Sequence, residues 1–423
     1  MKKAYSMVMV LMLVVGVLAA CGPDREKETG GSKEESGSAN KPEKLVVWED
    51  TDKGVGLEPA IKAFEKEHGI KVEYKEMGMA DKIREQIRLD GPAEKGPDVI
   101  TLPHDQIGQL AIEGVLAELK VDQSVIDTFT ESSIQAQTYD GKLYGLPKAT
   151  ETPVFIYNKK LMETPPATMD ELYAFAKENR KGNLYGFTAK WDDFYHAFGV
   201  IGGMGGYVFG DKDGTQNRDD LGLNNEGAIK GAEFIAKWYK DGLFPKGIIG
   251  ESGGSAQDGL FNEGKLASVQ NGPWAFQGYK DAGIDIGATA LPTLPNGEHM
   301  KTFMGVKGWH VSAYSKNKEW ATKLVEHLTN YDSAKVRYEK TQEIPPVKKL
   351  IEDPIIAENE FSKAVAEQSQ YAIPMPNIPE MGEVWGPMAA ALETIATDKA
   401  DAKSAMDEAV KTIQSNIETN HKK

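Results

Sequence analysis

The sequence has little of several features that mark common protein classes. It contains one cysteine in 423 residues, which excludes an intramolecular disulfide framework and the cysteine-rich zinc and iron–sulfur sites. Basic residues are in deficit, with 49 Lys and Arg against 64 Asp and Glu, and this argues against a protein that binds nucleic acid. The histidines are scattered without an HExxH or similar pair, so we expect no metal site.

Motifs for nucleotide binding and for common hydrolytic chemistry are also missing. No GxxxxGK[ST] loop and no GxSxG turn occur, and the glycines between residues 202 and 206 lack the GxGxxG spacing of a dinucleotide site. Paired carboxylates such as Asp105 and Glu151 are available, but among 64 acidic residues some close pair is expected by chance. We therefore expect no cofactor, and a lipid-anchored glycoside hydrolase is the less favoured alternative to a binding protein.

The only long hydrophobic run of the sequence lies at the N-terminus. Two lysines are followed by an apolar stretch that ends at Ala20, and Cys21 comes next. The run is too short to cross a bilayer comfortably, and with its basic start it has the pattern of a secretory signal peptide over residues 1–20. No other stretch approaches the about 20 apolar residues of a membrane-spanning helix.

The end of this run resembles a bacterial lipobox. The segment Leu18-Ala-Ala-Cys21 implies that Cys21 receives a diacylglyceryl group and becomes the mature N-terminus. An ordinary cleavage site beside an unrelated cysteine is the alternative. The rest of residues 21–43 is nearly devoid of apolar side chains, which predicts a flexible tether.

The residues after the tether alternate between strand and helix patterns. Apolar runs at residues 45–48, 70–74 and 98–102 predict strands, and between them apolar residues recur with helical spacing. This order predicts a parallel, doubly wound sheet with right-handed crossovers. If the strand order is 2-1-3, the loops after the first and third strands flank the ligand crevice. Those loops hold Asp52-Lys53 and His104-Asp105.

The second half of the chain predicts further strands and helices. Strand patterns occur at residues 154–157 and 303–312, and a hairpin is expected near Asp213-Gly214. The C-terminal segment is predicted to be a helix with one apolar face, made of Met406, Ala409, Val410, Ile413 and Ile417. The fold class is therefore α/β, and the length favours two lobes over one continuous sheet.

Aromatic residues stand beside polar residues at several predicted loop ends. These are Tyr195, Trp274 and Trp385. The C–H faces of a pyranose ring stack on aromatic side chains, while its hydroxyl groups hydrogen-bond planar partners such as carboxylates, so a neutral oligosaccharide requires a cleft with both. Core packing is the alternative role for a tryptophan; it is expected for Trp238 and Trp320, which lie in helical patterns, and is left open for Trp48 and Trp309.

At these positions the sequence resembles the extracytoplasmic maltose/maltodextrin-binding proteins of ABC importers. The motifs keep the family's order from about residue 44 to residue 415, and they include Trp48…Asp52-Lys53-Gly54, Gly96-Pro-Asp98…His104-Asp105, Glu151…Tyr157-Asn158-Lys159, Asn271-Gly-Pro-Trp274 and Met375-Pro-Asn-Ile-Pro379…Trp385. The resemblance implies a periplasmic-binding-protein-like fold, with two doubly wound α/β lobes joined by a multi-crossing hinge around the ligand cleft. The expected lobes are residues 44–149 plus 305–352 and residues 150–304 plus 353–423.

The resemblance also implies a sugar-binding role for eight residues. Asp52 and Lys53 match the pair that hydrogen-bonds sugar hydroxyls after the first strand, and Asp105 matches the aspartate after the third strand. Glu151 matches a glutamate just past the first hinge crossing, and Glu85 one at the distal end of the groove. The aromatic platforms of the second lobe are matched by Tyr195, Trp274 and Trp385.

Four positions depart from the family pattern. Leu102 and Gln106 stand where well-known members carry tryptophan and arginine, and Gly386 and Ala389 stand where tyrosine and arginine are expected. These changes leave the sugar class in place and the linkage open. A malto-oligosaccharide is the preferred ligand, and a galacto-oligosaccharide or a cyclodextrin is the alternative.

The sequence thus predicts a monomeric, lipid-anchored binding protein on the extracellular face of the cytoplasmic membrane. It would close around malto-oligosaccharide and deliver it to the transmembrane subunits of an ABC permease, with the lipid anchor as its only membrane contact. No metal, cofactor or nucleic acid takes part. A purely structural or adhesive protein is a further alternative, which predicts no saturable binding of a small ligand.

Overall fold

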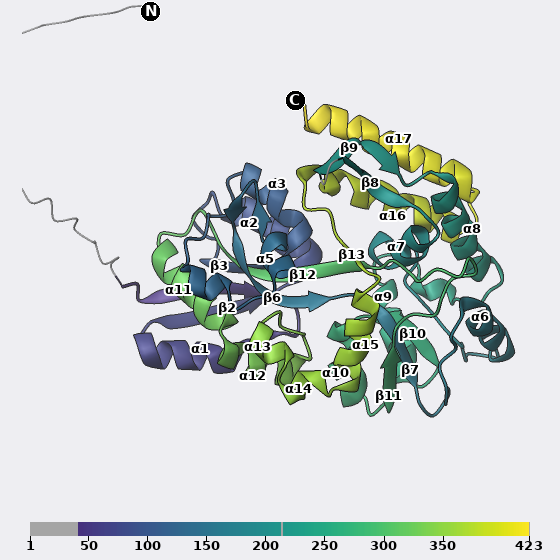
Figure 1. The fold of residues 1–423 in the computed structure, drawn as a ribbon, viewed down its shortest axis with the longest axis horizontal. Helices are drawn as coiled ribbons and strands as arrows, with labels where there is room; N and C mark the ends of the chain where they lie inside the picture. Colours follow the sequence, from purple (N-terminus) through teal and green to yellow (C-terminus); the bar gives the residue numbers. More distant parts are fainter. Residues whose placement is uncertain (1–40, 213–214, 423) are drawn as a thin grey trace, which may run out of the picture. The chain divides into compact units, whose positions relative to one another are not determined.

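A mixed sheet forms the first part of the fold (Figure 1). The computed structural model describes residues 41–212 and 215–422, so the predicted signal peptide, Cys21, most of the tether and the turn at Asp213-Gly214 lie outside the described residues. The strands follow the order β13-β12-β3-β1-β2, and β6 also pairs with β12. Their bounds are β1 Lys44–Glu49, β2 Lys71–Glu76, β3 Val99–Pro103, β6 Gly145–Glu151, β12 Phe303–Val311 and β13 Ile373–Pro374.

The first three strands have the order 2-1-3, which is the condition under which the loops after the first and third strands flank a crevice. Strand β1 pairs in parallel with β2 on one side and with β3 on the other. Helix α1 (Gly54–His68) connects β1 to β2, and its buried face includes Leu57, Ile61 and Phe64. The helix ends at Gly69, whose φ of 61° lies in the left-handed region that glycine tolerates, and the amide of Gly69 donates to the Glu65 carbonyl. The loops after β1 and β3 therefore lie at one edge of the sheet.

The second sheet is paired differently from the parallel strands β2, β1 and β3 of the first sheet. Strand β7 (Val154–Asn158) pairs antiparallel with both β10 (Ser268–Asn271) and β11 (Ile286–Thr289). Alternate residues of β7 face different cores: Phe155 packs in one apolar cluster, whereas Val154 and Ile156 pack in another. An apolar run indicates burial but not strand direction, which is set here by partners more than a hundred residues away.

The chain passes between the two sheets several times. Strand β6 leads into β7 after Glu151, and β12 pairs antiparallel with β6 along most of its length. The N-terminal end of β12 contributes Phe303 to the core around the second sheet, while its C-terminal end contributes Val311 to the core of the first. Strand β13 returns to pair with the start of β12. These shared strands have the connectivity expected of a hinge.

Helices cover both sheets. Those associated with the first sheet are α2 (Arg84–Asp90), α3 (Ile107–Ile112), α4 (Gln123–Ile126), α5 (Glu131–Ala136), α11 (Lys318–Thr329), α12 (Tyr331–Thr341) and α13 (Lys348–Ile351), with the short turns η1 (Met79–Ile83) and η2 (His104–Gln106). The remaining helices are α6 (Met169–Glu178), α7 (Phe194–Gly203), α8 (Glu226–Lys240), α9 (Gly253–Asn262), α10 (Phe276–Asp281), α14 (Pro354–Ala357), α15 (Glu360–Ser369), α16 (Gly382–Ala396) and α17 (Ala402–Asn420), with η3 (Lys246–Ile248), η4 (Pro273–Ala275) and η5 (Pro379–Met381). Within the described ranges, no helix has both the length and the apolar content needed to cross a membrane.

The predicted C-terminal helix and hairpin are both present. Helix α17 buries its expected apolar face, including Met406, Val410 and Ile413, and it lies beside α16 (Figure 1). Strands β8 (Tyr207–Lys212) and β9 (Thr215–Gly222) pair antiparallel, as the hairpin prediction requires. The two small strands β4 (Thr138–Tyr139) and β5 (Lys142–Leu143) form another antiparallel pair.

Four tryptophans occupy core positions. Trp238 is fully buried, as its helical pattern predicts, and Trp320 is partly buried against the core of the first sheet. Trp48 and Trp309, whose roles were open from the sequence alone, are also buried. By contrast Trp274 and Trp385 are only partly buried, and both reach the surface of a cleft.

Candidate functional site

A cleft of about 1180 Å³ is lined by residues from both sheets and from the strands that connect them. Seven of the eight predicted sugar-binding residues line it: Asp52, Lys53, Asp105, Glu151, Tyr195, Trp274 and Trp385. They come from segments more than 300 residues apart, and the topology brings them together. Their individual sugar-binding roles stay predictions.

The loop between β1 and α1 forms the first part of the polar wall. Asp52 adopts a φ of 60°, a left-handed conformation that aspartate tolerates better than most residues. Neighbouring Asp50 holds the loop in place, because its Oδ1 accepts hydrogen bonds from the amides of Thr51 at 2.9 Å and Met79 at 3.0 Å. Lys53 is buried, and its Nζ donates across the cleft to the carbonyl oxygen of Trp274 at 3.4 Å.

Asp105 forms the second part of the polar wall, in the turn η2 that follows β3. Burial raises the pKa of its carboxyl to about 6, while Arg84 and a hydrogen bond from the side chain of Trp385 favour the charged form. This carboxyl therefore changes charge in the pH range in which binding is normally measured. Asp105 lies in the turn after β3 of the first sheet and Trp385 lies in α16, so their contact also crosses the cleft.

His104 anchors the same turn from behind. Its Nδ1 accepts a hydrogen bond from the Val306 amide at 3.1 Å, so Nε2 carries the proton and donates to the Met375 carbonyl at 3.0 Å. Burial lowers the pKa of His104 to about 4, which keeps the ring neutral at physiological pH. His104 is thus a structural clamp between η2, β12 and the segment after β13.

The side chains of Tyr195, Trp274 and Trp385 form a second wall, called the aromatic wall below, and Tyr279 also lines the cleft. Tyr195 lies in the first turn of α7, whose N-cap Asp193 accepts from the Tyr195 amide at 2.9 Å. The rings of Tyr195 and Trp274 have centroids 6.1 Å apart, and Trp385 packs edge-on against Phe303 at 5.8 Å. The hydroxyl of Tyr195 is buried and has no hydrogen-bond partner among the described residues. An unpaired phenol of this kind is available to a ligand hydroxyl.

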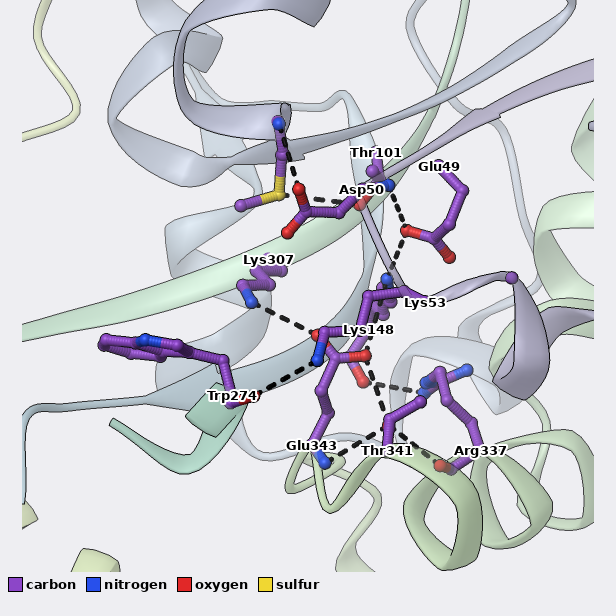
Figure 2. Close-up of polar contacts among 12 residues, drawn as sticks. Glu49, Asp50, Lys53, Thr101, Lys148, Trp274, Lys307, Arg337, Thr341 and Glu343 are labelled. Atoms are coloured by element: carbon purple, nitrogen blue, oxygen red, sulfur yellow. Dashed lines mark hydrogen bonds and ion pairs between the residues drawn. The ribbon is translucent and has the colours of Figure 1, made fainter. Parts of the chain in front are cut away.

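An ionic cluster, part of which is drawn in Figure 2, reaches the cleft through Lys307 and Glu151 and continues behind them into the core. Lys307 Nζ lies 2.7 Å from Glu151 Oε2 and 3.2 Å from Glu343 Oε1. Behind it, Lys148 Nζ lies 3.6 Å from Glu343 Oε2 and 2.6 Å from Glu49 Oε1. Burial raises the pKa of Glu151 and of Glu49, while the surrounding cations hold the pKa of Glu343 well below its usual range.

Lys307 and Arg84 line the cleft although the sequence analysis did not select them. A usable sequence pattern exists for Lys307, because it stands in the middle of Phe-Met-Gly-Val-Lys-Gly-Trp-His-Val, an otherwise nearly uncharged strand. A lysine is rarely buried in a strand unless it is paired with an acidic group. Arg84 shows no comparable pattern, since it is one of several charges on a polar helix.

Glu85 occupies a different place from the other seven predicted residues. It does not line the cleft, and its side chain is 59% exposed. Its Oε1 pairs with Arg84 Nε at 3.1 Å and with Arg88 Nη1 at 2.9 Å. The α2 residue that lines the cleft is its neighbour Arg84.

The departures from the family pattern have structural consequences. Leu102 is fully buried in the core around β3, so it presents no aromatic surface to the cleft. Gln106 does line the cleft; its Nε2 donates to the Ala80 carbonyl at 2.8 Å, and its Oε1 has no partner among the described residues. A neutral amide thus replaces the expected cation.

The cleft has the chemistry of a binding site for a neutral polyol. Seven acidic residues and four basic residues line it, so an anionic ligand meets an unfavourable potential. Across the part of the chain that the structure describes, no group of His, Cys, Asp and Glu side chains could hold a metal ion. Carboxylates and lysines can bind hydroxyl groups, and the three aromatic rings can stack on apolar sugar faces.

Comparison with known proteins gives consistent matches. Residues 59–364 match the sequence model of the family described as bacterial extracellular solute-binding protein. The chain is 49% identical to the galactooligosaccharide-binding protein of Bacillus subtilis (strain 168) and 38% identical to the maltodextrin-binding protein MdxE of that organism, in both cases over 100% of this chain and 99% of the relative. It is 36% identical to a maltooligosaccharide ABC transporter solute-binding lipoprotein of Streptococcus pneumoniae, over 95% of this chain and 94% of the relative.

Solved structures agree with these matches. A cyclo/maltodextrin-binding protein complexed with maltotetraose superposes with a TM-score of 0.76 at 41% identity, covering 90% of this chain and 99% of the other. MalX from Streptococcus pneumoniae in complex with maltopentaose superposes with a TM-score of 0.82 at 34% identity, covering 88% of this chain and 100% of the other. The predicted two-lobed α/β fold is therefore confirmed.

Proposed function

Because the chain belongs to the bacterial extracellular solute-binding proteins, we propose that it binds a neutral oligosaccharide in the cleft and delivers it to an ABC importer. One observation carries the proposal: the aromatic rings of Tyr195, Trp274 and Trp385 line the same cleft as several carboxylates and lysines. A sugar needs both kinds of surface at once, whereas an amino acid or an ion does not.

The preferred ligand is a malto-oligosaccharide. Support comes from relatives whose names specify maltodextrin or maltooligosaccharide and from structural neighbours with bound maltotetraose and maltopentaose. The cleft volume of about 1180 Å³ suits a ligand of several sugar units, since pockets for small molecules usually measure about 300–1000 Å³.

A galacto-oligosaccharide is the second candidate, and a specific observation favours it. The relative that carries this name is 49% identical to the chain, against 38% for the maltodextrin-binding protein of the same organism. Identity ranks the galacto-oligosaccharide first, while the number of relatives and the solved complexes support the malto-oligosaccharide. The replacement of an expected arginine by Gln106 also bears on the choice between the two sugars. The two side chains offer different hydrogen-bond donors, and the sugars differ in where their hydroxyl groups lie.

Lobe closure around the sugar is the mechanism that this arrangement supports. Lys53 reaches Trp274, and Asp105 reaches Trp385, so both walls touch each other when the cleft is narrow. A sugar held by the two walls binds the closed form better than the open form, and this differential affinity drives closure. The closed shape is then the form that permease subunits recognise.

The family is described as extracellular. In addition, we propose that a lipid is attached to Cys21. The Leu18-Ala-Ala-Cys21 segment supports it, as does the streptococcal relative described as a lipoprotein. Two acyl chains would hold a monomeric body at the membrane and raise its effective concentration near the permease. Mass spectrometry of the membrane fraction tests this, because a Cys21→Ser variant would lose both the lipid mass and the membrane association.

A calorimetric titration tests the ligand. Maltotriose, maltotetraose, a cyclodextrin and a β-1,4-galacto-oligosaccharide would be added separately to the purified body, and we expect saturable binding of the maltodextrins. Saturation by the galacto-oligosaccharide alone would identify the second candidate, and saturation by none of the four would overturn the proposal. We propose no catalytic role, so the same sugars recovered after prolonged incubation should show no new reducing ends.

A further inference from the structure

Lys307 occupies an unusual position for a lysine. It lies in the middle of β12, between buried residues such as Val306 and Trp309, and its side chain is only 3% exposed. Its ammonium group nevertheless reaches the cleft, where it lies 2.7 Å from Glu151 Oε2 and 5.9 Å from the centre of the Trp274 ring. Burial of an ammonium group is unfavourable in free energy unless the group is fully paired, so the contacts with acidic partners fix the position of the Lys307 side chain.

The pairing of Lys307 continues away from the cleft. Glu343 binds Lys307 through one oxygen and approaches Lys148 through the other, and Lys148 binds Glu49 at the end of β1. All three of these residues are almost completely buried, and none of them lines the cleft. The cluster therefore alternates in charge from the core outward and ends at Glu151.

Glu151 depends on this cluster more than the other cleft carboxylates do. Among the described residues, Lys307 is the one cation paired with it, and Lys307 binds one of its two oxygens. Burial raises the pKa of Glu151, and Glu343 and Asp50 raise it further, while Lys307 opposes all three effects. Removal of the cation would leave a carboxyl that is buried, unpaired and close to other acids.

We propose that Lys307 is a positioning residue for carbohydrate recognition, which holds Glu151 as an ionised acceptor with its second oxygen free for a sugar hydroxyl. The inference rests on the proposed function, because it assigns a ligand hydroxyl to Glu151. Glu343 and Lys148 support the position of Lys307 from the core. A charge-assisted hydrogen bond from the ligand is stronger than a bond to a protonated acid, so this arrangement acts on affinity.

Several charged or titratable groups face Glu151 from the elements around it. Lys307 comes from β12, Glu343 from the segment after α12, Asp50 from the loop after β1 and Tyr195 from α7. Burial and the neighbouring carboxylates raise the pKa of Tyr195 well above its usual value, so its charge stays constant in the neutral range. The pKa of Lys307 is also held well above its usual value by Glu151, Glu343 and Asp50. Glu151 is then the group expected to titrate when Lys307 is replaced.

The test compares Lys307→Met with wild type and with the charge-retaining Lys307→Arg. Sugar affinity would be measured between pH 5 and pH 8 with whichever of maltotetraose and β-1,4-galacto-oligosaccharide the wild type binds. In Lys307→Met the affinity should be at least about tenfold weaker at pH 6, and should fall about tenfold per pH unit below the raised pKa of Glu151. Lys307→Arg should restore most of the affinity.

Two further variants separate positioning from simple structural support. The double variant Lys307→Met with Glu343→Gln removes one charge of each sign from the core, which keeps the test available if Lys307→Met does not fold. In a Glu151→Gln background, Lys307→Met should add no pH dependence, because the group through which it acts is gone. An equal loss of affinity with and without Glu151, and with identical pH profiles, would overturn the proposal.

A measurement without sugar completes the test. Carboxyl ¹³C shifts of the glutamates would be followed by NMR, with the Glu151 signal assigned from Glu151→Gln. The Glu151 carboxyl should titrate at a higher pH in Lys307→Met, or in the double variant, than in wild type. Titration at the same pH in all of them would refute the role of Lys307, whereas failure of the wild type to bind either sugar would refute the proposed function alone.

Discussion

The two walls of the cleft are prepared for a ligand in different ways. On the polar wall, Asp50, Lys53 and Asp105 already have protein partners that hold them in place. The aromatic wall offers ring surface and an unpaired hydroxyl on Tyr195. Each hydrogen bond to a sugar replaces one to water, so its net contribution is modest, whereas burial of an aromatic face adds affinity directly. The aromatic wall is therefore expected to supply most of the affinity, and the polar wall most of the discrimination.

The largest effect is expected for Trp274→Ala, which tests whether the aromatic wall supplies most of the affinity. The variant removes the stacking ring and the contact surface beside Lys307, and we expect a loss of about 2 kcal/mol, or roughly thirtyfold in Kd. Calorimetric titration measures it, and Trp274→Phe, which keeps a smaller ring, should lose much less. Unchanged affinity in Trp274→Ala would return this residue to a packing role.

Asp105→Asn tests the contribution of the polar wall through the pH dependence of sugar affinity. The ionised carboxylate is the better acceptor, so wild-type affinity should be full above the raised pKa of about 6 and should fall as the pH drops below it. Asp105→Asn should bind about 1.5 kcal/mol more weakly at pH 7.5 and should lose the part of the pH dependence that comes from Asp105. A titration series from pH 5 to pH 8 checks both statements. An unaltered pH profile in the variant would show that Asp105 does not contact the ligand in its charged form.

Lys53→Met tests the contact between the walls. The variant loses the bond to the Trp274 carbonyl and the predicted donor to sugar hydroxyls, so we expect about 1 kcal/mol weaker binding. Lys62→Met, on the exposed side of the helix α1 that follows Lys53, is the matched control and should bind as wild type does. Equal affinities for the two variants would show that Lys53 does not contribute to sugar binding.

The smallest effect is expected for Glu85→Gln. Its side chain is exposed, lies outside the cleft and pairs with Arg84 and Arg88, so affinity should change by less than about 0.5 kcal/mol. A large loss would instead support the distal-groove role that the family resemblance implies, and it would mean that the groove extends beyond the present cleft.

Local patterns predicted the first sheet well. The alternation of strand and helix, with Leu57, Ile61 and Phe64 on one helical face, was sufficient for the parallel pairing of β1 with its neighbours. The order β2-β1-β3 entered only as a condition for placing the loops that carry Asp52 and Asp105 beside the crevice. The aromatic residues of the other wall were found from sugar chemistry and from the family motifs. In both cases the information lies within a short stretch of sequence.

Long-range features were not predictable in the same way. The antiparallel pairing of β7 depends on β10 and β11, which lie more than a hundred residues further along the chain. Lys307 was missed because its partners, Glu151 and Glu343, are near it only in three dimensions. Glu85 and Arg84 are adjacent in sequence but point to different surroundings, and a motif match cannot resolve which of two neighbours faces the cleft.

The central place of β12 has a consequence for how the chain folds. This strand closes the first sheet between β3 and β6, yet it is made of residues 303–311, nearly two hundred residues after β3. Until it is available, β3 is an unprotected edge with unpaired backbone groups, and such pairings of high contact order form slowly. A fragment that ends near residue 149 should therefore aggregate rather than fold, and the two lobes should lose their structure together when β12 is destabilised.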